Sequence, residues 1–185
     1  MPTRIGPYRA ALEEIGAALD RLDEGGFSAF VEAIASARRI ALYGVGREGL
    51  AIKGFAMRLF HLGLDVSMVG DMTTPSIGPG DLLVVSAGPG GFSTVDGLMG
   101  VARAAGARIA LVTANPGGSA AQLADTALVV PAQTMADDVG GASVLPMGSL
   151  FEGAGFILFE MAVMALAQRL GVGADAMRAR HTNLE

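Results

Sequence analysis

The chain has 185 residues, of which 51% are hydrophobic and 17% charged, and its formal net charge is −5. This length fits one domain with a sizeable core, here taken as residues 1–185. The negative charge and the lack of a long basic run exclude nucleic acid and anionic membranes as expected partners. Without cysteine the chain has neither a disulfide framework nor thiolate chemistry, and we expect a cytoplasmic protein.

Apolar residues at helical spacing open the chain, over residues 7–23 and 28–37, with Gly25 and Gly26 expected to separate the two helices. Strands and helices then alternate. The predicted strands are 39–43, 65–69, 82–85, 108–113 and 126–130, and the predicted helices between them are 48–61, 94–105 and 119–123. Alternation with apolar strands predicts an α/β fold, a doubly wound, five-stranded parallel sheet in a three-layer α/β/α arrangement.

Two glycine-rich turns follow strands of this sheet, the first at residues 44–49 and the second at residues 86–94. A turn of this kind gathers backbone N–H groups and a helix N-terminus around an anion. A single Gly-x-Gly turn, however, more often only connects a strand to a helix and binds nothing. Right-handed crossovers place both turns at the carboxyl edge of the sheet, where ligands bind. The predicted ligand-binding residues are Gly44, Gly46, Arg47, Glu48, Ser86, Gly88, Gly90, Gly91, Ser93 and Thr94.

The segment 131–147 has neither helical nor strand periodicity, and irregular segments of this length are usually functional or disordered. A strongly apolar stretch, 150–170, follows it. Because this stretch contains Glu152 and Glu160, we expect a core helix, shared with an oligomer interface, rather than a membrane span.

Three side chains are candidates for chemistry. A capping box with Ser149 as N-cap is sufficient to explain Glu152, and the alternative is a general base at a helix start beside a crevice. His61 ends a predicted helix, where a structural role is the default, and His181 lies in a charged tail that must dock before it can act. Neither histidine has metal-ligand spacing, and no metal or cofactor is predicted.

Three segments resemble the sugar isomerase (SIS) domain family, most closely its 6-phospho-3-hexuloisomerase branch: residues 57–63, 145–152 and 180–185. The similarity runs from about Tyr8 to the end of the chain. It implies a five-stranded sheet, a homodimer or homotetramer with sites at subunit contacts, and isomerisation of a sugar derivative. Carried over by motif, Glu152 is the base, and His61 and His181 line the site, one of them donated by a neighbouring subunit.

The chain departs from the family where the family holds phosphate. Glu48 stands in place of a serine, and three hydroxyl residues of the second turn are replaced by Ala87, Pro89 and Phe92. Hydrogen bonds to charged groups contribute about 1.5–3 kcal/mol each, so these losses weaken phosphate binding by about 5 kcal/mol or more. Two alternatives to a phosphosugar isomerase therefore stand: an isomerase of an unphosphorylated substrate, and a non-catalytic module that binds a sugar derivative.

Overall fold

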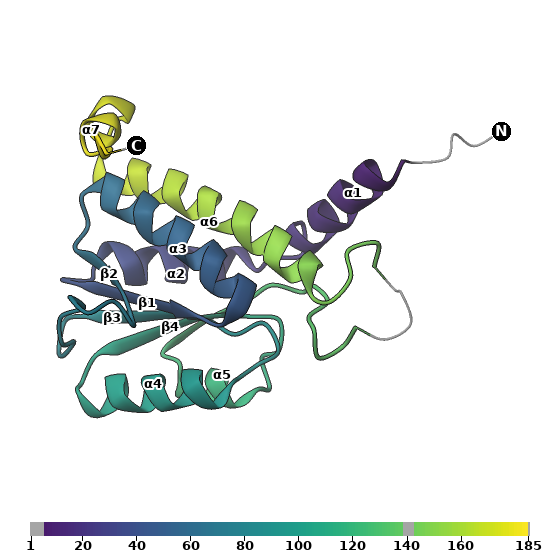
Figure 1. Ribbon diagram of the computed structural model, residues 1–185, viewed down its shortest axis with the longest axis horizontal. Coiled ribbons are helices and arrows are strands. Elements are labelled where there is room, and N and C mark those ends of the chain that lie inside the picture. Colours follow the sequence, from purple (N-terminus) through teal and green to yellow (C-terminus); the bar gives the residue numbers. More distant parts are fainter. Residues whose placement is uncertain (1–5, 139–142, 185) are drawn as a thin grey trace.

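The computed structural model describes residues 6–138 and 143–184 (Figure 1). Its five strands are parallel and form one sheet in the order β2-β1-β3-β4-β5, which confirms the predicted fold class. The strands are β1 (Ile40–Gly44), β2 (Val66–Met68), β3 (Leu82–Ser86), β4 (Arg108–Thr113) and β5 (Thr126–Val129). Their ends differ from the predicted ones by at most one residue, and those of β4 coincide with the prediction.

Helices cover both faces of the sheet (Figure 1). On one side lie α1 (Pro7–Leu19), α2 (Glu24–Ala35), α3 (Gly46–Leu62) and α6 (Ser149–Leu170), and on the other lie α4 (Ser93–Ala104) and α5 (Ser119–Leu123). The short α7 (Ala174–Ala179) follows α6. The predicted break at Gly25 and Gly26 is wrong. Both glycines lie inside α2, because Asp23 caps the helix by accepting a hydrogen bond from the N–H of Gly26.

Helix α6 is the most apolar element of the fold. Its length and composition are sufficient to cross a membrane. One side of it nevertheless packs on α1, α2 and α3, and residues such as Phe151, Leu158 and Leu166 are buried there. These contacts confirm the prediction of a core helix.

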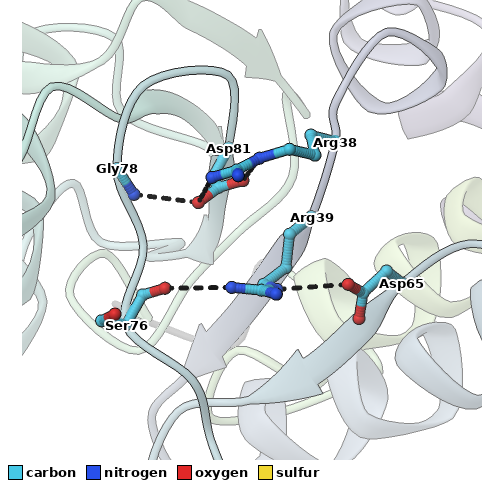
Figure 2. A network of polar contacts seen from close by, with 6 residues as sticks. All are labelled: Arg38, Arg39, Asp65, Ser76, Gly78 and Asp81. Carbon is cyan, nitrogen blue, oxygen red and sulfur yellow. Dashed lines mark hydrogen bonds and ion pairs between the residues drawn. The ribbon is translucent and has the colours of Figure 1, made fainter.

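The amino edge of the sheet is closed by ion pairs between the residues that precede the strands (Figure 2). Arg38 donates to both carboxylate oxygens of Asp81 at 3.0 Å, and the N–H of Gly78 donates to the same carboxylate at 2.9 Å. Beside them, Arg39 contacts Asp65 at 3.2 Å and the carbonyl oxygen of Ser76 at 3.2 Å. Asp81 is fully buried, and the guanidinium of Arg38 lowers the pKa of its carboxyl group.

Segment 131–147 has no helix or strand in its described part, as its lack of periodicity predicted; residues 139–142 lie outside the described residues. Side chains hold its two ends together. Asp137 accepts from the N–H and hydroxyl of Thr134, and Asp138 accepts from the N–H of Met147. These bonds keep the segment against the start of α6.

Candidate functional site

The candidate site lies at the carboxyl edge of the sheet, where β1 and β3 end side by side. Gly44 and Ser86 are register partners there, and the helices that follow the two strands lie on opposite faces. Such a switch point leaves a crevice in an open parallel sheet. A cavity of about 250 Å³ occupies it, lined by Val45, Gly46, Arg47, Glu48, Pro89, Phe92, Thr134, Met135, Gly148, Phe151 and Glu152. Two larger hollows border α1 and α2 and contain none of the predicted site residues. A third, of about 370 Å³, shares Pro89 and Thr134 with this cavity and includes Gly88.

Arg47 joins the first turns of α3 and α6. Its Nε lies 3.0 Å from a carboxylate oxygen of Glu152, one terminal nitrogen donates to Ser149 Oγ at 2.9 Å, and the other donates to the carbonyl oxygen of Met147. The predicted capping box is therefore wrong. The N-cap is Gly148, without a side-chain cap, because Arg47 takes both side chains that the box needed. Glu152 is left directed at the cavity.

The carboxyl group of Glu152 is partly buried, with a side chain 20% exposed. Burial raises its pKa above the ordinary value, and the neighbouring charge of Arg47 opposes that rise. A carboxylate held beside a crevice by one guanidinium can accept a proton from a bound molecule.

Glu48 points inward from the first turn of α3, and only 8% of it is exposed. Its carboxylate accepts from Ser86 Oγ at 2.5 Å and from the N–H of Gly88 at 3.0 and 3.1 Å. Burial raises the pKa of Glu48, and the charge of Glu152 adds to the rise. A Cβ on Gly88 would lie 2.8 Å from the ring of Phe151 and 3.2 Å from Glu48 Oε1, so only glycine allows this approach.

The structure brings some of the predicted binding residues to the cavity and not others. Gly46, Arg47 and Glu48 line it, and Gly44, Ser86 and Gly88 lie under Glu48. Farther along the second turn, Gly90 and Gly91 pack against Asn115 and Ser119, while Ser93 and Thr94 are exposed in the first turn of α4. Ala87 lies in the core beneath the sheet, whereas Pro89 and Phe92 are cavity walls.

His61 and His181 are together at the other end of α3. Their rings stack with centroids 5.1 Å apart, and they line a second cavity of about 240 Å³ with Arg58, Ala174, Met177 and Arg178. The tail does dock, because Arg180 donates to the carbonyl oxygens of His61 and Ala176. At about 1.5 Å per helical residue, His61 lies about 20 Å along α3 from Arg47. Glu185, the last residue of the tail motif, lies outside the described residues.

Seven cavity walls were not among the predicted site residues: Val45, Pro89, Phe92, Thr134, Met135, Gly148 and Phe151. Thr134 and Met135 come from the irregular segment, whose only signal in the sequence is its unusual length. Phe151 lies within a predicted core helix, and nothing in the apolar pattern distinguished it. Across residues 6–138 and 143–184, no group of three acidic or histidine side chains has the arrangement of a metal site.

The chain matches the SIS domain family over residues 33–148. It is 38% identical to the 3-hexulose-6-phosphate isomerase of Mycobacterium gastri, over 94% of this chain and 87% of that protein. The 3-hexulose-6-phosphate isomerase of Methylomonas aminofaciens is 37% identical, over 88% and 89% of the two chains. A crystal structure from Methanococcus jannaschii, from which 3-hexulose-6-phosphate isomerase function was inferred, is similar with a TM-score of 0.83 at 28% identity, covering 95% of this chain and 97% of that one.

Proposed function

Because the chain belongs to the SIS domain family, we propose that it is an aldose–ketose isomerase acting on a sugar or sugar phosphate at the cavity beside β1 and β3. The observation that carries the proposal is the position of Glu152. Its carboxylate faces the cavity, and it pairs with Arg47 instead of capping its own helix. The relatives named 3-hexulose-6-phosphate isomerase support the same reaction class.

In the proposed mechanism the Glu152 carboxylate removes a proton from the sugar carbon next to the carbonyl group. The electrons of that C–H bond form the carbon–carbon double bond of an enediol, while the carbonyl oxygen takes up a proton. Glu152 then returns its proton to the former carbonyl carbon, while the hydroxyl group on the carbon first deprotonated releases its proton and becomes the new carbonyl group, which completes the isomerisation. Arg47 orients the carboxylate and favours its ionised form, which is the form that a base requires.

Two further parts of the proposal concern assembly. We propose a cytoplasmic homo-oligomer, a dimer or a homotetramer, in which His61 and His181 of one subunit reach the cavity of another. Two observations support this. The two histidines lie together at the carboxyl end of α3, whereas Glu152, on α6, contacts Arg47 at the amino end of α3. In addition, α3 and α6 leave large apolar side chains exposed. These side chains are Leu50, Met57, Phe60, Phe156, Ile157, Met161 and Met164.

The reaction is tested by incubating the protein in D₂O with a panel of free and phosphorylated aldoses and ketoses. NMR spectroscopy then follows the loss of sugar C–H signals. We expect exchange on at least one sugar, and Glu152→Gln should lower its rate by roughly 10²–10⁴-fold, the usual contribution of a general base. The matched control is Glu24→Gln, an exposed glutamate of α2, which should retain activity. Wild-type protein that binds a sugar without exchanging any C–H hydrogen is instead a binding module.

The shared site is tested by mixing two inactive variants, Glu152→Gln and His61→Asn, under conditions that exchange subunits. If the histidines serve a neighbouring cavity, hybrid oligomers contain some intact sites and activity returns. Activity that never returns, although native mass spectrometry detects the hybrids, would place both roles within one subunit and contradict this part of the proposal.

A further inference from the structure

We propose that Glu48 takes the place of a ligand phosphate at the carboxyl edge of the sheet, so that the cavity binds an unphosphorylated sugar whose hydroxyl group donates to the Glu48 carboxylate. The inference deepens the proposed function and rests on it for the identity of the ligand as a sugar. It makes Glu48 the residue that determines substrate class.

In the first half of the second glycine-rich turn, residues 86–90, the hydrogen-bond donors already have acceptors within the protein. The hydroxyl of Ser86 and the N–H of Gly88 both donate to Glu48. The N–H of Ala87 donates to Val112 in the neighbouring strand, and that of Gly90 donates back to Ala87. Pro89, between them, has no N–H at all. From residue 86 to residue 90 no donor remains for a phosphate oxygen.

The charges that line the cavity also oppose a phosphate. Glu48 and Glu152 are carboxylates, and Arg47 is the only cationic side chain among the lining residues. Its guanidinium already contacts Glu152, Ser149 and the carbonyl oxygen of Met147. A phosphate dianion entering this cavity would face two carboxylates with no unengaged cation, so Coulombic repulsion opposes it.

The Glu48 carboxylate can still accept a hydrogen bond from a ligand. Its Oε1 accepts only from the N–H of Gly88, at 3.1 Å, and a carboxylate oxygen can accept a second donor. A sugar hydroxyl is a neutral donor of suitable size. The remaining walls include Phe92, Pro89 and Met135, against which the C–H faces of a sugar can pack. Burial raises the pKa of Glu48, and a donated hydroxyl offsets that cost.

The experiment is calorimetric titration of the full chain with fructose 6-phosphate and with inorganic phosphate. We expect a dissociation constant in the millimolar range or weaker for the wild type, and for Glu48→Ser an affinity for fructose 6-phosphate at least tenfold higher. Glu48→Gln, which keeps the shape and removes the charge, should change affinity in the same direction and decides the matter if the serine variant does not fold. The matched control is Glu24→Ser, another first-turn glutamate, which is exposed on α2 and should leave affinity unchanged.

Micromolar binding of fructose 6-phosphate by the wild type overturns the inference, and so does a failure of both Glu48 variants to gain affinity. The D₂O assay separates this from failure of the proposed function. C–H exchange on an unphosphorylated ketose but not on fructose 6-phosphate supports both the role of Glu48 and the proposed isomerase function. If Glu48→Ser gains phosphosugar affinity but the wild type exchanges no C–H hydrogen, the role of Glu48 is supported and the proposed isomerase function is contradicted.

Discussion

The two edges of the sheet each hold a buried carboxylate beside β1 and β3. At the amino edge, Asp81 has a bidentate partner in Arg38 and a third donor in Gly78 (Figure 2). At the carboxyl edge, Glu48 accepts from Ser86 and Gly88, and no lysine or arginine of the described residues forms an ion pair with it.

This difference in partners sets opposite protonation tendencies. Arg38 lowers the pKa of Asp81, whereas burial raises the pKa of Glu48. A buried carboxylate with a full set of partners stabilises the fold. One without a cation costs stability, and such a cost is typical of functional sites. The amino edge is therefore the structural end of the strand pair, and the carboxyl edge is the end available to a ligand.

The largest effect is expected for Asp81→Asn at the amino edge. Removing the charge leaves the guanidinium of Arg38 without its carboxylate, and we expect Tm to fall by roughly 5–10 °C. The rate per folded molecule should stay within about twofold, since Asp81 is at the opposite edge from the cavity. Differential scanning calorimetry with an activity assay measures both. The control is Asp65→Asn, an exposed partner of Arg39, with an expected change of about 1 °C. Equal losses in the two variants would show that burial of Asp81 does not matter.

Gly88→Ala tests the carboxyl edge by steric means. The added Cβ would lie 2.8 Å from Phe151 and 3.2 Å from Glu48, and overpacking of this kind costs about 1–3 kcal/mol. Tm should fall by roughly 3–6 °C, and unlike Asp81→Asn the variant should also lose activity, because Glu48 is displaced. Gly100→Ala is the control, since nothing lies within 4 Å of its Cβ position on α4. Unchanged activity in Gly88→Ala would show that the position of Glu48 does not affect the reaction.

The sequence predicted the five strands well, because apolar runs and the glycine-rich turns that follow them are local signals. It placed Gly44, Ser86 and Glu48 at one edge from topology alone. A residue in the first turn of a helix can either be exposed at the helix start or face a site, so the position of Glu48 in the sequence does not decide between the two. The structure shows that Glu48 faces the site, because Gly88 lacks the Cβ that would block it.

The capping box failed for a different reason. The local pattern of Ser149 and Glu152 is sufficient for a cap, and the competing partner, Arg47, is about a hundred residues away in the sequence. Long-range contacts of this kind carry no periodicity. The same limit explains why Thr134 and Met135 were missed as cavity walls, since the irregular segment owes its position to its own side-chain hydrogen bonds.

The stability of Glu48→Gln should depend on pH differently from that of wild type. A carboxyl whose pKa is raised by folding stabilises the protein fully below its unfolded pKa, and that contribution is lost as pH rises through the folded pKa. At pH 8 the glutamine variant should therefore be more stable than wild type, by a few degrees in Tm, with the difference closing in acid. Asp81→Asn should instead be less stable than wild type at pH 8, again with the difference closing in acid, because a carboxyl with a lowered pKa contributes stability that is lost as pH falls. Thermal melts from pH 4 to pH 8 compare the two, and curves of the same sign would contradict the assignment of the edges.

The smallest effect is expected for Arg47→Gln, and it concerns the proton that Glu152 is proposed to accept. Burial raises the pKa of Glu152 and the charge of Arg47 lowers it, so removal of that charge leaves the burial effect unopposed. A base must be ionised to act, and the acid limb of the pH profile of kcat/KM should therefore move to higher pH. Near pH 8, where the carboxylate is ionised in both proteins, the rate should differ by only about threefold, the part due to lost orientation. Arg47→Lys keeps the positive charge and should leave the acid limb near its wild-type position. An acid limb that stays in place in Arg47→Gln would mean that another group sets it, and that the base of the proposed reaction is not Glu152.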